Sequence, residues 1–288
     1  MDKFDLSDIT IAIVSFKSEE IIENSIKSIN PKIPIIVVEN SNNNNFKENL
    51  EKNFKNVKCI LAKDNVGYSV ANNIAINNSI TKLVFIINPD VELLEGTMDR
   101  LIEAANKVKN FAILAPLTQE DIDYLRIHDD RFKDESITEV YTSQLKGCAM
   151  LLNKIEFNNI SYFDENYFLY FEELDLCTKL VKNKKLIYLI PKARFVHLGG
   201  KSHNPNISYE MELSRNWHFM WSSFYFTTKY KGYFYSFFSH IHKLILYFLK
   251  SFLYLLLFNK KKFNIYKNRF SGLFNSMLKN KSWYRPRV

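Results

Sequence analysis

The chain has 288 residues, of which 47% are hydrophobic and 24% are charged. This composition excludes a disordered or low-complexity protein, and the length allows one large domain or one domain with an appendage. Three widely spaced cysteines predict neither a disulfide framework nor a zinc site. The acidic start MDKFDLSD predicts that there is no signal peptide, so we expect a reduced, cytoplasmic protein.

The net charge of +8 is unevenly distributed along the chain. Residues 213–288 contain 14 Lys and Arg and no Asp or Glu, whereas the first 212 residues carry 25 basic and 31 acidic side chains. An acidic body followed by a basic, aromatic tail predicts two parts. We expect the main domain to span residues 1–207 and a helical region to span residues 208–288.

Apolar, β-branched runs alternate with stretches of helical periodicity over the first 115 residues. The expected strands are 10–16, 33–40, 57–62, 83–88 and 111–116, and the expected helices are 18–29, about 70–80 and about 96–109. Runs that are apolar on both faces and separated by helices predict an α/β fold with a mostly parallel sheet. Ligands of such sheets bind at the carboxyl ends of the strands.

The rest of the main domain is less regular. Residues 118–140 are charged and poorly periodic, and they are predicted to form a mobile loop or hairpin. A strand is expected over 146–152 and a helix close to Glu172, and LIYLI and ARFVHLGG are expected as two further short strands. From about residue 208 the chain is predicted to be helical.

Several polar residues and glycines stand where such a sheet binds ligands. Glu39 ends one expected strand, Asn88-Pro89-Asp90 ends another, and Gly67 lies between a strand and a helix. Each has an ordinary structural explanation, because Asn, Pro and Asp favour turns, negative charge favours a helix start and a histidine such as His197 is often buried. The lack of a GxGxxG motif disfavours a dinucleotide-binding fold.

In their order and spacing, these motifs resemble the family 2 glycosyltransferases of the GT-A fold, particularly the bacterial rhamnosyltransferase-like members. VENS resembles the family's VDNAS, NVGYSVANN its NxGFAAANN, and FLYFEELDLCTKL its FLYFEDVDLCLRL. The resemblance extends from about residue 9 to 284. It implies a Rossmann-like, mostly parallel sheet flanked by helices in a catalytic domain, with a C-terminal amphipathic helical appendage.

The resemblance also implies an inverting, metal-dependent hexosyltransferase with a nucleotide-sugar donor. Asn88 and Asp90 occupy the positions of the family's D-x-D, and with His197 they are expected to bind Mg²⁺ or Mn²⁺. Since Asn88 leaves one carboxylate where two are usual, metal binding is expected to depend on the donor's phosphates. Glu173 aligns with the catalytic aspartate and is expected to take the proton of the acceptor hydroxyl, with Glu172 ranked second as the base and Asp175 third.

The remaining expected site residues fall into two groups. Donor binding is assigned to Ser15, Glu39, Asn65, Gly67, Asn88 and Asp90. The acceptor side is assigned to Glu172, Asp175, Gly147 and Trp217. For Trp217 the alternative is packing of the tail helix against the main domain. The aromatic residues from Tyr162 to Phe171 are read as an acceptor face for sugar rings, and the alternative is core packing.

The resemblance favours dTDP-L-rhamnose as the donor, followed by other dTDP- or UDP-sugars. We expect a glycan acceptor, lipid-linked, in the synthesis of a cell-surface polysaccharide. Two other functions remain open. A sugar nucleotidyltransferase would need a glycine-rich, basic loop near the first strand, where the sequence has only Lys17, and an inactive membrane-bound scaffold would fit the unusual Asn88 and Glu173.

The tail segment HKLILYFLKSFLYLLLFNKKK (242–262) is predicted to be a basic amphipathic helix. Its polar stripe consists of Lys243, Tyr247, Lys250 and Tyr254. The longest uncharged run, residues 251–259, is too short to span a bilayer. We expect this helix to lie on an anionic membrane at the inner face of the cell membrane. One alternative is that the helix packs within the chain or against a second subunit of a homo-oligomer. The other is nucleic-acid binding, which we do not expect.

Overall fold

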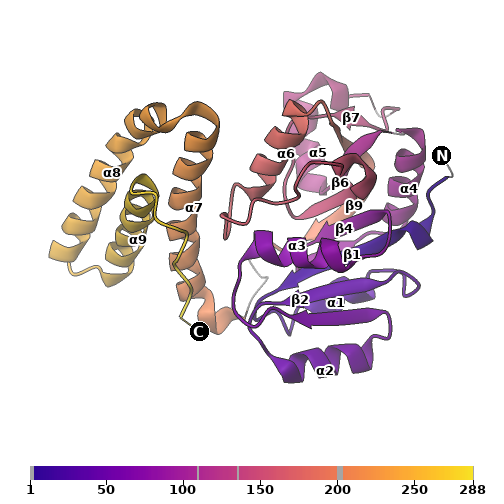
Figure 1. Ribbon diagram of the computed structural model, residues 1–288, viewed down its shortest axis with the longest axis horizontal. Coiled ribbons are helices and arrows are strands. Elements are labelled where there is room, and N and C mark those ends of the chain that lie inside the picture. Colours follow the sequence, from indigo (N-terminus) through magenta and orange to yellow (C-terminus); the bar gives the residue numbers. More distant parts are fainter. Residues whose placement is uncertain (1–2, 109, 135, 200–203, 288) are drawn as a thin grey trace. The chain divides into compact units, whose positions relative to one another are not determined.

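The computed structural model describes residues 3–108, 110–134, 136–199 and 204–287 (Figure 1). The chain divides into two compact units. The first comprises the residues up to 66, residues 70–163 and residues 176–204. The second, called here the helical unit, comprises residues 67–69, residues 164–175 and the chain from residue 205 onward. Two short segments distant in sequence therefore belong to the same unit as the tail.

The first unit is built on one mixed, mostly parallel sheet. Its strands are β1 (Ile9–Ser15), β2 (Ile35–Glu39), β3 (Val57–Leu61), β4 (Leu83–Ile87), β5 (Val91–Leu93), β6 (Phe111–Leu117), β7 (Val140–Tyr141), β8 (Ala149–Asn153) and β9 (Leu186–His197). Their order is β3-β2-β1-β4-β8-β6-β9-β5, with β7 paired to β9. Strands β3, β2, β1 and β4 are parallel, β6 and β9 are parallel to each other, and β8 is antiparallel to both β4 and β6.

The chain passes from β1 to β2 and β3 on one side and then returns to β4 on the other side of β1. A switch point of the topology therefore lies between β1 and β4, which is where open α/β sheets bind ligands. Every residue of β1, β2, β4 and β8 is buried, as the continuous apolar runs require. The expected α/β fold with a mostly parallel sheet is confirmed.

Helices flank this sheet (Figure 1). They are α1 (Ile22–Lys27), α2 (Asn44–Asn53), α3 (Tyr68–Asn78), α4 (Thr97–Lys107), α5 (Gln119–His128) and α6 (Glu172–Lys182), with short 3₁₀ turns at Leu6–Asp8, Asp130–Phe132 and Lys154–Phe157. A further 3₁₀ turn, Pro205–Ile207, belongs to the helical unit. Helices α3 and α6 each begin in the helical unit and continue in the first unit.

Two sequence predictions about this unit were wrong. Residues 118–140 contain helix α5, where the Thr118 side chain accepts a hydrogen bond from Asp121 N and the Asp121 carboxylate accepts one from Thr118 N. Its periodicity is weak because Ile122 is its one buried residue. The two short strands expected at LIYLI and ARFVHLGG form the single strand β9, whose register with β6 shifts next to Pro191. Gly200, at the end of the second run, lies outside the described residues.

The helical unit contains α7 (Ser208–Lys231), α8 (Tyr233–Leu256) and α9 (Lys260–Met277). Helices α7 and α9 approach closely at Gly272, where an added Cβ would lie 2.2 Å from the carbonyl oxygen of Trp217. Trp217 is fully buried, and its indole Nε1 donates a hydrogen bond to Ser271 Oγ at 3.2 Å. The side chain that was assigned to the acceptor therefore lies in the core of the helical unit.

We expect Gly272→Ala to lower the free energy of unfolding by about 2–3 kcal/mol, because the new methyl group would press against the backbone of α7. Helix propensity acts in the opposite direction, since alanine is favoured over glycine by about 1 kcal/mol. Urea unfolding followed by circular dichroism measures the difference, with Lys267→Ala as a control at an exposed position of the same helix. An unchanged or higher midpoint for Gly272→Ala would contradict the close approach.

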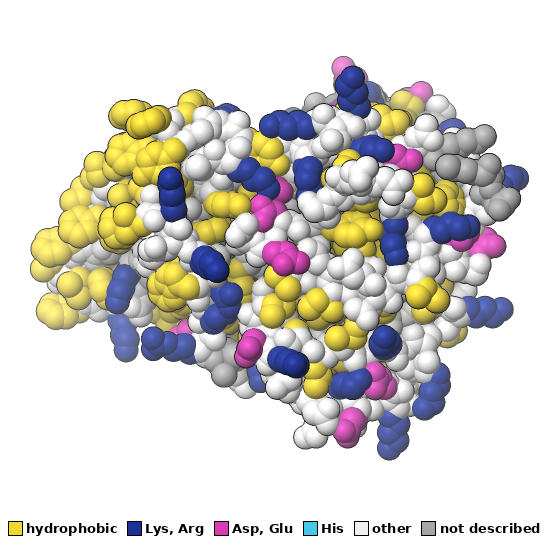
Figure 2. Space-filling view, viewed as in Figure 1, with side chains coloured by type: hydrophobic (Ala, Val, Ile, Leu, Met, Phe, Trp, Pro, Cys, Tyr) yellow, Lys and Arg dark blue, Asp and Glu magenta, His cyan; other side chains and the backbone are white. Residues whose placement is uncertain are grey.

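The polar stripe of α8 faces α9. The rings of Tyr247 and Tyr254 lie 6.2 and 5.5 Å from the ring of Tyr266, and Lys250 Nζ lies 5.2 Å above the same ring. The apolar side of α8 is left exposed, and 13 of the 26 exposed large hydrophobic residues in the described chain fall between residues 234 and 258. Figure 2 shows these side chains gathered over α8. None of the helices in the described ranges is long and apolar enough to cross a membrane.

Candidate functional site

Polar side chains gather at one edge of the sheet, beside the switch point. Ser15 and Glu39 are paired across the ends of β1 and β2. Ile13 of β1 is paired with Ile87, the last residue of β4, so that Asn88 and Asp90 follow at the same edge. The register therefore brings the carboxyl ends of β1, β2 and β4 to one edge of the sheet.

His197 joins this edge from the end of β9. It pairs with Val91 across β5 and β9, and Leu198 N donates a hydrogen bond to the backbone oxygen of Asp90 at 3.1 Å. The Asp90 side chain is 2% exposed, and its Oδ1 lies 3.3 Å from His197 Nε2. The neighbouring Asp90 carboxylate raises the pKa of the His197 imidazole. The Asp90 carboxylate and the His197 imidazole therefore converge at this edge.

Their geometry fits a shared divalent cation. Two adjacent ligands of one octahedral ion, each about 2.1 Å from it, lie about 3 Å apart, close to the distance between Asp90 Oδ1 and His197 Nε2. Asn88 is held beside them by its backbone N–H, which donates to Cys148 O at 3.0 Å. In the described ranges no group of three His, Cys, Asp or Glu could hold a metal. A cation here would therefore need the Asn88 amide or oxygen atoms of a ligand.

Glu39 and Ser15 are both fully buried. Glu39 Oε1 accepts hydrogen bonds from Ser41 N and Ser41 Oγ at 2.9 and 2.6 Å, and Oε2 accepts one from Asn43 N at 2.9 Å. Glu39 thus organises the turn that precedes α2. Ser15 Oγ has no hydrogen-bond partner in the described part of the chain.

Gly67 belongs to the helical unit, and it has a φ of +86°. An added Cβ would lie 2.6 Å from the Phe168 side chain and 2.7 Å from the Phe168 carbonyl oxygen. Tyr68 N donates to that same oxygen at 2.8 Å. A side chain at position 67 would collide with Phe168, which explains why a glycine occupies this position. Asn65, which is partly exposed, precedes it in the first unit.

The pair Glu172–Glu173 opens α6 directly after two residues in a left-handed conformation. Tyr170 and Phe171 have φ values of 68° and 69°, which are strained for aromatic residues. Glu172 is 6% exposed, whereas Glu173 is partly exposed. In the described residues, Oε2 of each carboxylate has no hydrogen-bond partner.

Burial shifts both carboxyl groups toward the protonated form. It raises the pKa of Glu172 well above its usual range, and the charge of Glu173 raises that pKa further. Burial also raises the pKa of Glu173, although hydrogen bonds from the backbone at Glu173 and Leu174 oppose the shift. Glu173 is therefore the member of the pair that retains its charge more readily and is accessible.

Asp175, ranked third as a base, is fully buried in an ion pair. Lys229 Nζ lies 2.7 Å from Asp175 Oδ1 and 2.7 Å from Asp164 Oδ2, and Tyr230 OH donates to Asp175 at 3.0 Å. These contacts fasten the start of α6 to α7. Lys229 escaped the sequence analysis because a single lysine in an aromatic helix carries no distinct signal.

A hollow of about 300 Å³ in the first unit is lined in part by Cys148, whose backbone oxygen accepts the hydrogen bond from Asn88 N. Lys146 and Cys148, which flank Gly147, line it together with Asp121, and its remaining wall is largely apolar. Lys146 Nζ lies 2.5 Å from Asp121 Oδ1, so the two charges at this hollow are paired with each other. Asp121 was missed because residues 118–140 were predicted to be a loop.

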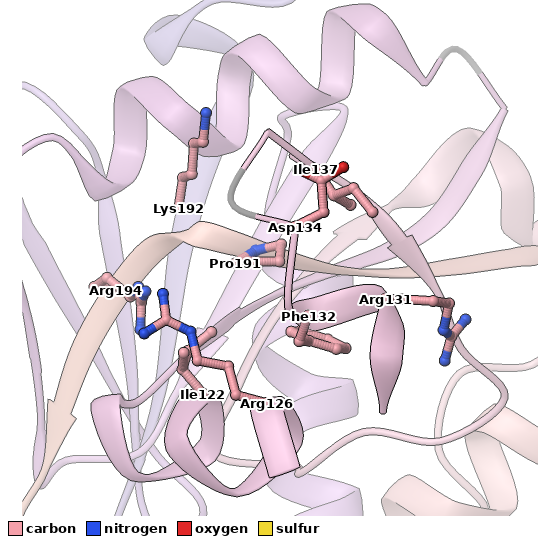
Figure 3. Close-up of a pocket in the computed structure, with 9 residues that line it drawn as sticks. All are labelled: Ile122, Arg126, Arg131, Phe132, Asp134, Ile137, Pro191, Lys192 and Arg194. Atoms are coloured by element: carbon pink, nitrogen blue, oxygen red, sulfur yellow. The ribbon is translucent and has the colours of Figure 1, made fainter. Parts of the chain in front are cut away.

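A second hollow in the first unit has a volume of about 190 Å³ (Figure 3). Its lining contains four basic side chains, Arg126, Arg131, Lys192 and Arg194. Figure 3 shows Arg126 and Arg194 extending toward each other, while Lys192 points away. Burial, followed by the charge of Arg126, lowers the pKa of Arg194. None of the site residues expected from the sequence lines this hollow.

Comparison with known proteins finds similarity to glycosyltransferase sequences. The sequence model of "Glycosyl transferase family 2" matches residues 10–177. The chain is 27% identical over 192 residues to the low-salt glycan biosynthesis hexosyltransferase Agl10 of Haloferax volcanii, covering 60% of this chain and 61% of that protein. It is 22% identical over 207 residues to the N-acetylglucosaminyl-diphospho-decaprenol L-rhamnosyltransferase of Mycobacterium tuberculosis, covering 57% of this chain and 66% of that protein. The matches thus span less than two thirds of either relative.

Among solved structures, the fold is similar to that of the mannosyltransferase PcManGT from Pyrobaculum calidifontis, in complex with GDP-Man and Mn²⁺. The TM-score is 0.59 at 10% identity, and the match covers 95% of this chain and 88% of that chain. This likeness concerns the fold alone. It confirms the GT-A fold that the sequence motifs implied.

Proposed function

Because the chain belongs to glycosyl transferase family 2, we propose that it transfers a hexosyl group from a nucleotide-sugar donor to a glycan acceptor. The observation that carries this proposal is the Asp90–His197 pair, 3.3 Å apart at the switch point of the sheet. A nucleotide sugar has a diphosphate group, and the edge beside a switch point is where such ligands bind in α/β sheets.

We assign the donor to this edge. Asp90, His197 and Asn88 would hold a Mg²⁺ or Mn²⁺ ion, and when bound the ion would neutralise the diphosphate as it leaves. Ser15 and Glu39 end the neighbouring strands. Among the described residues, Glu39 Oε2 accepts one hydrogen bond, from Asn43 N, which leaves capacity for the N–H of a pyrimidine base.

We assign the role of general base to Glu173. The oxygen of an acceptor hydroxyl forms a bond to C1 of the donor sugar while the bond between C1 and the diphosphate oxygen breaks. The electron pair of the broken bond leaves with the diphosphate, and the hydroxyl proton passes to the Glu173 carboxylate. Attack opposite the leaving group inverts C1. The partial exposure of Glu173 and its unpartnered Oε2 support this role.

For the donor we propose dTDP-L-rhamnose, with other dTDP- or UDP-hexoses as the alternatives. The named activities of the relatives, a hexosyltransferase and an L-rhamnosyltransferase, support this range. The name of the second relative describes an acceptor in which a diphosphate joins a sugar to a decaprenol chain. We accordingly propose a lipid-linked glycan acceptor for this chain.

A donor screen tests the proposed activity. The purified chain is incubated with Mn²⁺ or Mg²⁺ and a panel of dTDP-, UDP- and GDP-sugars, with and without a lipid-linked acceptor extract, and release of nucleoside diphosphate is followed. Metal-dependent release with one donor, increased by acceptor, is the expected result. A chain that binds no nucleotide sugar in the presence of either metal would instead be a scaffold.

We further propose that the helical unit rests on an anionic membrane at the inner face of the cell membrane. Six exposed apolar residues of α8 form one stripe at helical spacing: Phe234, Phe238, Ile245, Leu249, Phe252 and Leu256. Exposed lysines lie at both ends of the helix, at Lys231 and at Lys260 to Lys262, and no acidic residue follows Glu212. Two copies meeting through this face would bring like charges together, whereas anionic head groups would neutralise them.

We expect the double substitution Leu249→Glu and Phe252→Glu to weaken binding to phosphatidylglycerol-containing vesicles by about 100-fold or more, since two apolar side chains become charged. Both residues are more than half exposed, at 56% and 53%, so the fold is expected to persist. Vesicle flotation measures binding, and Ile80→Glu is the matched control because Ile80 is 99% exposed in the first unit. A dimer that dissociates in the double variant, without vesicle binding by the original chain, would refute the membrane proposal.

A further inference from the structure

The helical unit contains a hollow of about 340 Å³ that no part of the donor site uses. It is lined by Tyr170, by Arg215, Asn216, Phe219 and Met220 of α7, by Tyr247 of α8 and by Arg269 of α9. The three helices of the tail and the segment just before α6 therefore all contribute to it. Its lining holds two arginines and no acidic residue.

Both guanidinium groups retain donors for a ligand. Arg215 Nε donates to Met211 O, one turn earlier in its own helix, at 3.3 Å. Arg269 Nε donates to Asn216 Oδ1 at 2.6 Å. In the described ranges neither arginine forms a salt bridge, and no hydrogen bond engages their Nη groups. Planar guanidinium groups of this kind match the oxygen atoms of phosphate.

Arg269 is held in place by aromatic rings. The guanidinium carbon of Arg269 lies 5.7 Å from the ring centre of Tyr247 and 5.6 Å from that of Tyr266. Phe219 is 49% exposed, and its ring packs edge to face on Tyr170 at 5.7 Å. The hollow thus combines fixed positive charge with aromatic surface, which suits a ligand that is both anionic and apolar.

The hollow also lies near the proposed base. Tyr170, which lines it, precedes Glu172 by two residues. Burial raises the pKa of Tyr170, Arg215 lowers it, and Glu172 and Glu173 raise it. Tyr170 is therefore within electrostatic range of both Arg215 and the carboxylate pair.

We propose that Arg215 and Arg269 bind the diphosphate group of a lipid-linked acceptor in this hollow. The proposal rests on the proposed function for the nature of the acceptor. Arginines from two different helices can each hold one phosphoryl group, which favours a diphosphate over a single phosphate. Helix α8 supplies Tyr247 to the hollow and the exposed apolar stripe on its other side, so a lipid chain that leaves the hollow has an apolar surface on the same helix.

Isothermal titration of the full chain with farnesyl diphosphate, with farnesol as the uncharged reference, tests the site. We expect farnesyl diphosphate to bind at least tenfold more tightly than farnesol. Arg215→Gln is expected to remove most of this difference, because the affinity for farnesyl diphosphate should fall by about 10- to 100-fold when a charged hydrogen-bond donor is lost. Arg287→Gln, at an exposed arginine of the same unit, is the matched control.

Arg269→Gln is the second variant, with circular dichroism to confirm its helix content, since Arg269 also contacts two rings. The titrations are repeated with saturating dTDP and Mn²⁺. Equal affinity for farnesol and the diphosphate, an unchanged affinity in Arg215→Gln, or displacement of the probe by dTDP would each overturn the proposal. Binding of the probe requires no turnover, so failure of the donor screen alone would leave this result standing.

Discussion

Replacing Glu173 with glutamine is expected to reduce sugar transfer by about 10³-fold while leaving donor affinity nearly unchanged. General bases contribute about 10²- to 10⁴-fold, and the amide keeps the size of the side chain but cannot take a proton. The measurements are the rate of nucleoside diphosphate release with acceptor and the dissociation constant of the unreacted donor. Reduced turnover at constant donor affinity would identify a group that acts in the transfer step.

Glu172→Gln is the matched control, since it makes the same change one residue earlier at a buried side chain. We expect it to retain most of the activity, and a loss as large as that of Glu173→Gln would assign the base to the pair instead. The pH profile gives a second readout. Because burial raises the pKa of Glu173, its carboxylate becomes protonated at a higher pH than an ordinary glutamate. The rate of the original chain should therefore fall as the pH decreases through this raised pKa, and Glu173→Gln should lack that limb.

Asp90→Asn is expected to weaken metal-dependent donor binding by about 100-fold, because it removes the single carboxylate of the Asn88-Pro89-Asp90 segment. The Asp90 side chain is 2% exposed and lies against His197, so the neutral amide fits the same space. Titration of dTDP or UDP into the chain, with and without Mn²⁺, separates the metal-dependent part of the affinity.

Glu92→Gln serves as the control for this change, since Glu92 is a partly exposed carboxylate two residues later on β5. It should behave as the original chain does. If Asp90→Asn kept its full Mn²⁺-dependent affinity, the ion would have to be bound elsewhere, and the assignment of Asn88, Asp90 and His197 as its ligands would be incorrect. Loss of affinity in the absence of metal as well would indicate a disturbed fold, which the unfolding midpoint would reveal.

Strands β1, β2, β4, β6 and β8 were predictable from sequence, because strands buried on both faces need continuous apolar runs. The short strands β5 and β7 were not predicted. The convergence of Ser15, Glu39 and Asp90 was predictable for a related reason. Parallel strands present all their carboxyl ends at one edge, so residues at those ends meet wherever the strands are neighbours. Helix α5 was not predictable in the same way, since it buries Ile122 alone and most of its residues face solvent.

Sequence by itself thus determined the class of fold, the position of Asp90 at the carboxyl edge of the sheet, and the presence of an amphipathic helix in the tail. The tertiary structure decided what the side chains do there. Asp175 resembles its neighbours Glu172 and Glu173 in sequence, but it pairs with Lys229, 54 residues later, and only spatial distance separates an ion-pair partner from a free base. Periodicity likewise reveals that α8 has a polar and an apolar face, but which face is covered depends on where α9 packs, and here α9 covers the polar one.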